Sequence, residues 1–574
     1  MRIKSGLRMH YHWATEPAPG AMTHKPPLVP RPAATLVLAR ETQGGVEVFM
    51  LRRTHGAAFG GGAYVFPGGA LDAADSDGDI AHSGMDDTQA SRLLDVDRGG
   101  LAYWIAAVRE CYEEAVLLLA YEGAELLALD DPAKLAEFAG LRKKLIAGEI
   151  TVAELCRSRG LRLALDRLAY LSHWITGPGA PRRFDTRFFV AVAPPLQTPS
   201  HDAGETVSHL WIRPAEALER HRSGDFKLMF PTIKTLELLA RFAQAAAVME
   251  HARTPRPMPA MLPHPACGRD GPRYLVASDF AYAEVSKLDP GGTGTASYEI
   301  LPGVAVRLSD RVRRITAPNP GVMTGPGTNS YLLGSGNHIA VIDPGPAHEA
   351  HLQMLLEEAR GRIRWILVTH THLDHSPAAA PLKAMTGAEL LGMAPPPGES
   401  QDRTFRPDRV LAHGERLDIA GCALRVIHTP GHASNQLCYM LEDEKLLFTG
   451  DHIMQGSTVV INPPDGDMIQ YLASLRMLLR EDIAYLAPGH GFLMGKPHEA
   501  VERLLIHRMG RENKVLKALQ RSGPAALEVL VPEVYDDVPE RMHRVASRSL
   551  LAHLLKLEVE GRAHQSGGRW SIRA

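Results

Sequence analysis

The sequence is poor in two features that would restrict its class. Only five cysteines are present, and no Cys-x-x-Cys pair occurs, which argues against a disulfide framework and favours a reducing compartment. No stretch reaches the roughly 20 apolar residues that a membrane helix needs. Residues 1–30 lack the apolar core of a signal peptide. We therefore expect a cytoplasmic protein without a membrane partner.

Net charge and aromatic residues are also scarce. A formal net charge of −2 over 574 residues produces no strong field toward nucleic acid or membrane. Aromatic residues make up 6% of the chain, so few side chains are available to stack on bases. Hydrophobic content of 45% is ordinary for a globular protein, and the length predicts roughly three or four domains.

Changes in composition predict five successive parts. Residues 1–30 are expected to form a flexible tail, and residues 31–250 alternate strand-like and helical patterns typical of an α/β domain. Breakers such as Pro255, Pro257 and Gly291–Gly292 lie in residues 251–300 and indicate a linker. Residues 301–496 form a second α/β region, and residues 497–574 contain two helical stretches and a hairpin signal.

The densest group of metal-binding side chains is the run from His370 to His375. It contains three histidines and one aspartate within six positions. Residues 365–368, which precede it, are apolar and are typical of a buried strand. A loop that follows a strand can turn several side chains toward one point. Imidazole nitrogen and carboxylate oxygen suit zinc or a similar divalent metal.

Other short apolar runs are followed by residues of the same chemistry. The residues that end or follow these runs are Asp343, Gly431-His432, Gly450-Asp451 and Gly489-His490. The order His-x-His-x-Asp-His, Gly-His, Gly-Asp, Gly-His resembles the metallo-β-lactamase-fold hydrolases, which implies an αββα sandwich for residues 301–496.

The resemblance also implies two Zn²⁺ ions and their ligands. One metal would be held by His370, His372 and His432, the second by Asp374, His375 and His490, with Asp451 bridging. Such a pair activates a hydroxide at neutral pH, and Asp374 is also expected to orient it. Asn329, in the segment Gly327-Thr328-Asn329, either orients substrate near the metals or stabilises a turn.

A second acidic cluster lies in the N-terminal half. On a helix, Glu110, Glu113 and Glu114 occupy positions i, i+3 and i+4 and share one face. Three carboxylates on one face suit Mg²⁺ or Mn²⁺ shared with substrate phosphates. For this helix alone, the alternative is a solvated acidic face.

Together with the turn Pro67-Gly68-Gly69, this helix resembles a Nudix box. Asp75 replaces the usual glutamate, extra residues separate Asp75 from Arg109, and Val116 replaces the usual glycine. Such an interrupted box, with residues 173–176 and 182–189, resembles the coenzyme A diphosphatase-like branch. This implies a Nudix α/β/α fold with Mg²⁺ or Mn²⁺. The resemblance assigns substrate binding to Gly68 and Gly69, loop-setting to Arg109 by pairing with a carboxylate, and catalysis to Arg109 and Glu113. We interpret His201 and Glu205 as ordinary loop residues.

The C-terminal segment predicts a winged helix. Its helices are expected at about 498–521 and 539–560, with Gly567-Gly568 in the hairpin. With the Gly-Thr-Asn segment, this tail resembles the lactamase-β-like branch, whose members include a single-strand-specific endoribonuclease. From Val501 onward, 13 Lys/Arg stand against 9 Asp/Glu. Mild basicity is compatible with nucleic-acid contact, and packing that gates the hydrolase site is the alternative.

Three functions follow from these patterns. The first is hydrolysis of phosphodiesters, with single-stranded RNA as substrate. The second is glyoxalase-II-like hydrolysis of small acyl thioesters, which the coenzyme A-type Nudix neighbour favours. In the third, the Nudix domain is only a binding module rather than a pyrophosphohydrolase. The sequence leaves homo-oligomer formation open.

Overall fold

The structure is a computed structural model that describes residues 28–56, 60–202 and 206–573. The predicted tail, up to residue 27, and Glu205 lie outside the described residues. The chain forms two compact units that divide after Ala260, and we describe each by itself. No helix in the described ranges is both long enough and apolar enough to cross a membrane.

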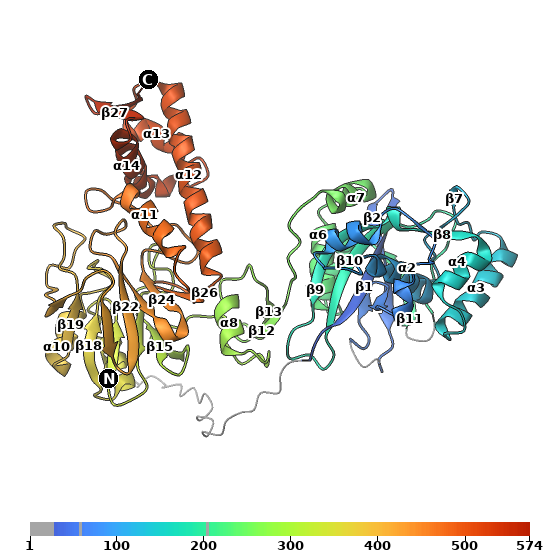
Figure 1. The fold of residues 1–574 in the computed structure, drawn as a ribbon, viewed down its shortest axis with the longest axis horizontal. Coiled ribbons are helices and arrows are strands. Elements are labelled where there is room, and N and C mark those ends of the chain that lie inside the picture. The colour runs from blue at the N-terminus through green and yellow to red at the C-terminus, as the bar shows by residue number, and fades with distance from the viewer. Residues whose placement is uncertain (1–27, 57–59, 203–205, 574) are drawn as a thin grey trace, which may run out of the picture. The chain divides into compact units, whose positions relative to one another are not determined.

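The first unit is built on a mixed sheet with the strand order β11-β2-β1-β10-β9 (Figure 1). Strand β1 pairs in parallel with β10 and antiparallel with β2, while short β3 and β4 extend the sheet. The strands are β1 (Arg31–Thr42), β2 (Gly45–Arg53), β3 (Tyr64–Val65), β4 (Gly68–Ala70), β9 (Ala169–Ile175), β10 (Phe184–Val192) and β11 (Thr206–Ile212).

Both faces of β1 are covered, which explains its nearly continuous apolar sequence. Leu36 and Leu38 pack in one cluster with Trp104 and Val108 of helix α2 (Leu101–Ala115). Helix α7 (Ala245–Arg253) contacts β1, β9 and β10. The predicted α/β/α Nudix architecture is thus confirmed. The other helices near this sheet are α5 (Pro214–Arg222) and α6 (Phe230–Leu239).

The extra residues between Asp75 and Arg109 fold into elements of their own. Strand β5 joins a small sheet of order β5-β8-β6-β7, and α1 leads back to α2. The elements before α2 are η1 (Ala73–Ser76), β5 (His82–Ser83) and α1 (Asp87–Leu94). The elements between α2 and β9 are β6 (Ala120–Glu122), β7 (Glu125–Leu126), α3 (Pro132–Ile146), α4 (Val152–Arg159), β8 (Leu161–Ala164) and η2 (Leu165–Arg167).

The second unit contains two sheets packed face to face between helices, the predicted αββα sandwich. The first sheet has the order β14 to β20, and the second has the order β21 to β26. Its strands are β14 (Ala305–Arg307), β15 (Val312–Thr316), β16 (Asn329–Leu333), β17 (Ile339–Ile342), β18 (Ile363–Leu367), β19 (Glu389–Gly392), β20 (Arg409–Val410), β21 (Arg416–Ile419), β22 (Cys422–His428), β23 (Leu437–Leu441), β24 (Leu446–Gly450), β25 (Tyr485–Pro488) and β26 (Met494–Gly495).

Alternating side chains of these strands fill three apolar layers. Ile342 and Leu367 meet Val426 and Tyr439 between the two sheets. The outer face of the first sheet packs against α9 (Glu349–Ala359). Helix α10 (Ala379–Thr386) joins the same layer, while α11 (Met468–Leu478) and the start of α12 (Pro497–Ser522) cover the second sheet. Short η3 (Glu442–Glu444) links β23 to β24.

Residues 264–288, within the predicted linker, carry regular structure. They form β12 (His264–Ala266), β13 (Arg273–Leu275) and α8 (Tyr282–Leu288). Glu284 of α8 is buried and makes two bonds with Arg314 of β15, at 2.6 and 3.0 Å. It also accepts a hydrogen bond from the Leu493 backbone. The Pro- and Gly-rich breakers therefore flank a segment that belongs to the second unit.

The C-terminal residues form the predicted winged helix. Both predicted helices and the terminal hairpin are present (Figure 1). Trp570 is buried among them. Short α13 was not predicted, because Pro532 interrupts its helical pattern. The elements after α12 are α13 (Leu527–Val534), η4 (Glu540–Met542), α14 (His543–Val559), β27 (Ala563–Ser566) and β28 (Arg569–Ile572).

Candidate metal centre

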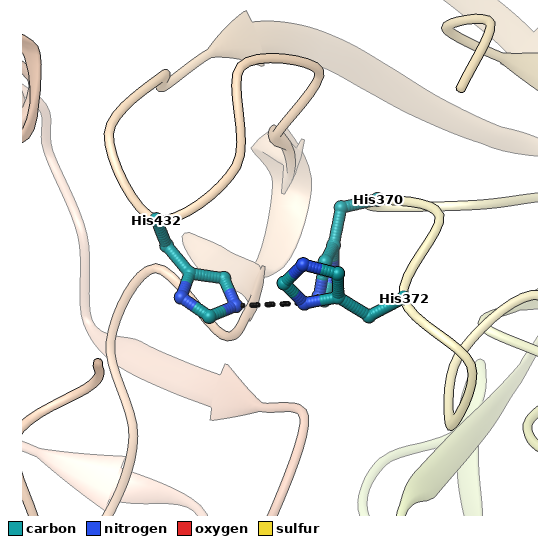
Figure 2. A group of neighbouring side chains, drawn as sticks. All are labelled: His370, His372 and His432. Carbon is teal, nitrogen blue, oxygen red and sulfur yellow. Dashed lines mark hydrogen bonds between the residues drawn. The ribbon is translucent and has the colours of Figure 1, made fainter. Parts of the chain in front are cut away.

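Three imidazoles converge in front of the β18 and β22 strand ends (Figure 2). The Nδ1 atom of His372 lies 3.0 Å from Nε2 of His370 and 3.0 Å from Nε2 of His432. Burial, followed by the neighbouring His432, lowers the pKa of His372 to about 3. Burial also lowers the pKa of His370 and of His432. All three rings are therefore neutral at pH 7, and they bring nitrogen lone pairs to one point.

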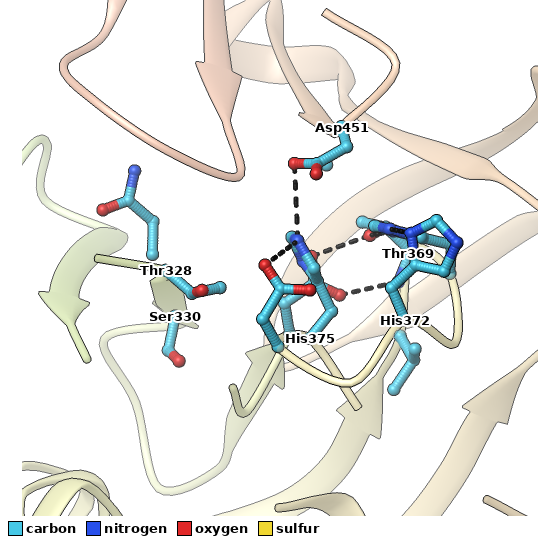
Figure 3. Close-up of polar contacts among 12 residues, drawn as sticks. Thr328, Ser330, Thr369, His372, His375 and Asp451 are labelled. Carbon is cyan, nitrogen blue, oxygen red and sulfur yellow. Dashed lines mark hydrogen bonds and ion pairs between the residues drawn. The ribbon is translucent and has the colours of Figure 1, made fainter. Parts of the chain in front are cut away.

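A second group lies beside the first and contains two carboxylates. The Nε2 atoms of His375 and His490 each lie 3.3 Å from Oδ1 of Asp451, and Figure 3 shows Asp451 beside His375. Asp374 Oδ2 lies 3.3 Å from His490 Nε2 and 3.5 Å from His375 Nε2. The other oxygen of Asp451 lies 3.9 Å from Nε2 of His432 in the first group. Asp451 therefore reaches both groups, as a bridging ligand must.

Outer hydrogen bonds fix the direction of the rings. His375 Nδ1 is 2.9 Å from the Asp343 carboxylate, and His432 Nδ1 is 2.8 Å from the Val460 carbonyl. His490 Nδ1 is 3.1 Å from the Gly327 carbonyl. Since these oxygens accept hydrogen bonds, each Nδ1 carries the proton in the neutral ring. The Nε2 lone pair then faces the centre, as metal binding requires.

Three buried polar atoms test whether metals fit here. His375 Nε2, His490 Nε2 and Asp451 Oδ1 have no hydrogen-bond partner. Buried polar atoms are rarely left in this state, and all three point to the same place. In both groups, one ligand atom from each residue lies within 4.8 Å of the others. A divalent cation in the second group would satisfy these atoms, and the three imidazoles of the first group offer donors for another, so the residues fit a pair of metals.

The charges of the second group depend on its protons. Burial opposes protonation of His490, but Asp451 and Asp374 outweigh it and raise the pKa of His490 to about 9. Burial likewise opposes ionisation of Asp374, but His375 and His490 lower its pKa to about 2. Protons thus hold this group together in the metal-free protein, and metal binding displaces them.

Glycines bring the ligand loops close enough to meet. A Cβ on Gly489 would lie 2.6 Å from Asp451 Oδ1 and 2.7 Å from His375 Cε1. Gly431, with φ of +144°, leaves no room for a Cβ beside the Tyr471 backbone. Any larger residue at these positions would push a ligand away.

Arg109 lies at the centre of the acidic cluster in the N-terminal unit. Its Nε and Nη2 donate to the two oxygens of Asp75, at 2.9 and 3.0 Å. Its Nη1 donates to Glu110 at 2.9 Å and to Glu113 at 3.3 Å. The extra residues thus leave the contact between Arg109 and Asp75 intact. A single internal cation thus pairs with three carboxylates, in contrast to the histidine-rich centre.

The turn at Gly68 and Gly69 packs tightly on the same carboxylates. The Gly68 backbone donates to Glu114 at 2.9 Å, and a Cβ on Gly69 would lie 2.5 Å from Glu110. Burial, opposed by Arg109, raises the pKa of Glu110 to about 7. Burial also raises the pKa of Glu113. The turn and the helix therefore form one compact acidic site.

Comparisons with known proteins agree with this geometry. A family model described as the metallo-beta-lactamase superfamily matches residues 323–490. A beta-lactamase-like protein 2 homolog of Drosophila melanogaster is 32% identical over 290 residues, which are 46% of this chain and 94% of that protein. The chain belongs to the metallo-beta-lactamase superfamily. Models for the beta-lactamase associated winged helix domain and the NUDT19 Nudix domain match residues 527–570 and 79–239.

Two further relatives cover different parts of this metallo-beta-lactamase superfamily protein. An atrochrysone carboxyl ACP thioesterase of Aspergillus fumigatus is 32% identical over 235 residues, or 40% of this chain and 71% of that protein. A NUDIX hydrolase structure from Alicyclobacillus acidocaldarius is 29% identical, with a TM-score of 0.31, and covers 39% of this chain and 96% of that one. The two family models together show a metallo-beta-lactamase superfamily hydrolase fused to a Nudix domain.

The structure brings together all predicted ligands of the metallo-beta-lactamase domain. They form two groups: His370, His372 and His432, then Asp374, His375, Asp451 and His490. The predicted Nudix ligands Glu110, Glu113 and Glu114 lie near one another but do not converge in this way among the described residues.

Asn329 lies beneath the metal centre rather than at its mouth. It is fully buried, and its side-chain amide donates to the carbonyls of Pro488 and Gly491, at 3.0 and 2.9 Å. Its Oδ1 accepts from Thr316. These bonds support the loop that carries His490, and this placement favours the turn-stabilising interpretation.

The sequence did not assign the oxygens that orient the histidines. Asp343 was noted as a strand-end acid without a role, although its position after β17 was the available signal. The carbonyls of Gly327 and Val460 belong to the backbone, so the residue types at these positions do not indicate their role.

Proposed function

We propose that the metallo-beta-lactamase domain hydrolyses acyl thioesters with a pair of Zn²⁺ ions. The observation that carries this proposal is the similarity to a named ACP thioesterase across most of that protein's length. The histidine and carboxylate donor set suits Zn²⁺. When bound, the two ions would supply an activated water and stabilise the developing charge on the scissile carbonyl oxygen.

Each side chain of the centre has a role in this proposal. The seven ligands hold the metals, with Asp451 between the two groups. Asp374 has a side chain that is 29% exposed, compared with 10% for Asp451. Asp374 is thus the more accessible of the two carboxylates, and in this proposal it also orients the attacking water.

Exposed apolar side chains near the ligands support an acyl substrate. Leu373, between His372 and Asp374, is 56% exposed. Val322 is 82% exposed and lies on the loop that leads to Gly327, whose carbonyl holds His490. An acyl chain would cover such residues, whereas a polyanionic backbone would not.

The Nudix domain is proposed to cleave a nucleoside diphosphate group with Mg²⁺ or Mn²⁺. Glu110, Glu113 and Glu114 supply the carboxylates, Glu113 acts as the base, and Gly68 and Gly69 bind substrate. A thioester of a nucleotide-bearing carrier such as coenzyme A contains both bonds, so one molecule would present a substrate for each domain. We also propose a cytoplasmic location, which agrees with five free cysteines.

Phosphodiester cleavage in single-stranded RNA is the second candidate, and one charge pattern favours it. Among the described residues, Arg541, Arg544 and Arg548 are exposed without a recorded ion pair. Several other bases of the winged helix are paired, for example Lys514 with Asp536. The three arginines lie on one side of η4 and the first turns of α14, where they fit a row of phosphates.

The test compares two substrates on the Zn²⁺-loaded full-length protein. We expect release of free thiol from a medium-chain acyl-coenzyme A, lost in His372→Ala, and no cleavage of labelled single-stranded RNA. RNA cleavage that disappears in His372→Ala, without thiol release, would replace the thioester proposal by the nuclease. Thiol release that persists in His372→Ala would contradict the assignment to this centre.

A separate variant tests the Nudix domain. Glu113→Gln is expected to abolish Mg²⁺-dependent cleavage of the coenzyme A pyrophosphate while leaving thiol release unchanged. If the wild-type protein binds coenzyme A at this site but neither protein cleaves it, the domain is a binding module.

A further inference from the structure

The metal ligand His432 is oriented by a loop that the winged helix holds on both sides. The Val460 carbonyl accepts the hydrogen bond from His432 Nδ1. The preceding carbonyl, of Val459, accepts from the guanidinium of Arg508 in α12. The following backbone N–H, of Ile461, donates to Ser549 Oγ of α14 at 3.2 Å. Two consecutive peptide groups, 459–460 and 460–461, thus connect the C-terminal helices to a metal ligand.

Burial makes these contacts difficult to replace by water. Arg508 is 2% exposed and Ser549 is 6% exposed. Val459 and Ile461 are buried as well, in the apolar layer that covers the second sheet. A buried carbonyl or N–H that loses its partner is left with its full desolvation cost. The loop is therefore expected to move if either partner is removed.

Arg508 also supports the other side of the His432 loop. Its guanidinium lies 5.3 Å from the centroid of the Tyr471 ring. The Tyr471 hydroxyl donates to the His452 carbonyl at 3.1 Å, and the Tyr471 backbone packs directly against Gly431. Arg508 thus contacts both the loop that accepts from His432 and the residue that supports its backbone.

We infer that Arg508 and Ser549 are positioning residues of the metal centre. They fix the Val460 carbonyl, which sets the tautomer and ring direction of His432. The winged helix is thereby part of the site that His370, His372 and His432 form. Outer partners of this kind typically change metal affinity by about 10–100-fold. The inference rests on the proposed metal pair but not on the identity of the substrate.

The chain offers matched controls for both residues. Arg511 lies one turn further along α12, is 5% exposed, and donates to Val534 and Asp537 within the winged helix. Ser547 lies two residues before Ser549, and its hydroxyl donates to the Arg544 carbonyl of its own helix. Among the described residues, neither Arg511 nor Ser547 is hydrogen-bonded to the loop at 459–461, so each control variant reports on the stability of the winged helix.

The experiment measures Zn²⁺ binding to the full chain without substrate. Protein is equilibrated in Zn²⁺ buffers of decreasing free concentration, and bound metal is counted by elemental mass spectrometry. We expect Ser549→Ala and Arg508→Met to lower the affinity for one of the two Zn²⁺ ions by roughly 10–100-fold. Ser547→Ala and Arg511→Met should keep both ions, even where Arg511→Met unfolds at a lower temperature.

The Co²⁺-loaded protein gives a second readout. Its visible absorption should change in Ser549→Ala, because the ring direction of one imidazole ligand changes. Wild-type affinity for both ions in Ser549→Ala would overturn the inference, as would an equal loss of metal in Arg511→Met. If Arg508→Met does not fold, the result for Ser549→Ala alone tests the inference, because that substitution removes only one hydroxyl. Failure of the thioesterase proposal would appear as missing turnover in protein that has both metals bound. Because metal is counted here without substrate, the two failures can be told apart.

Discussion

The metal centre of the metallo-beta-lactamase domain and the acidic cluster of the Nudix domain are built in opposite ways. In the metallo-beta-lactamase domain, seven ligands from several strand ends converge, and three of their buried atoms lack a hydrogen-bond partner. In the Nudix domain, carboxylates from one helix and one turn surround Arg109, which bonds to Asp75, Glu110 and Glu113. The first site needs an external cation to be complete, whereas the second already contains a cation.

This difference separates two uses of buried charge. The unpaired atoms of the metal centre are stable only with a metal or with extra protons on His375 and His490, so occupancy there is linked to proton release. Arg109 stabilises the Nudix box without metal and limits the charge that remains for Mg²⁺. We therefore expect tight binding at the first site and weaker, substrate-assisted binding at the second.

The largest effect on either site is expected when one ligand of the metal centre is removed. His372→Ala deletes the imidazole that lies between His370 and His432. We expect turnover to fall by more than about 100-fold, since even outer partners change activity by 10–100-fold. Metal content should decrease while the circular dichroism spectrum stays native. A variant with full metal content would refute the ligand assignment. Activity at the Nudix domain, measured in the same sample, serves as the control and should be unchanged.

Removal of the internal cation should unfold the other site instead. Arg109→Met leaves the buried Asp75 and Glu110 without their partner, which costs about 3–5 kcal/mol. Hydrogen exchange of residues 101–115 in increasing urea would report this loss. Arg40→Met is the control, because its pair with Glu47 is exposed and is worth less than about 1 kcal/mol. Equal effects in both variants would show that Arg109 does not hold the box together.

The sequence predicted the metal ligands because their positions follow a simple rule. Parallel strands such as β17 and β18 end at one edge of a sheet, so Asp343 and His370 must lie near each other. The spacing of polar residues after apolar runs was enough to find both ligand groups. Similarly, the interval between Glu110 and Glu114 places both on one helix face.

The contacts that orient these ligands could not be predicted in the same way. Arg508 lies in a helical pattern without any motif, and its role depends on how α12 packs against a loop about fifty residues earlier. The pair Glu284–Arg314 is similar, because the Pro- and Gly-rich flanks of α8 indicated only a linker. Pairings between segments far apart in the chain depend on packing geometry, which neither periodicity nor composition records.

A change of pH is expected to have a smaller effect, on the unfolding free energy of the Nudix domain. Burial raises the pKa of Glu110 to about 7 from an ordinary value of 4.5. The folded protein then binds more protons than the unfolded one between these values. Its unfolding free energy should therefore fall as the pH rises from about 4.5 through about 7, by on the order of 1–3 kcal/mol. Urea unfolding with EDTA present measures this, and Glu110→Gln should remove that part of the slope. An identical slope in the variant would contradict the assignment.

The smallest effect is expected at the residue that departs from the Nudix pattern. Val116 ends α2 with φ of 60° and ψ of 21°, a left-handed conformation that is unfavourable for a β-branched side chain by about 1–2 kcal/mol. Glycine adopts it freely but loses more entropy on folding, by about 0.5–1 kcal/mol. Val116→Gly should thus raise the unfolding free energy by about 0.5–1 kcal/mol. Asp95→Gly is the matched control, because Asp95 ends α1 with φ of 54° and aspartate tolerates this region better. A larger gain at Asp95 than at Val116 would show that Val116 is not strained, and that its side chain contributes packing which the usual glycine would lack.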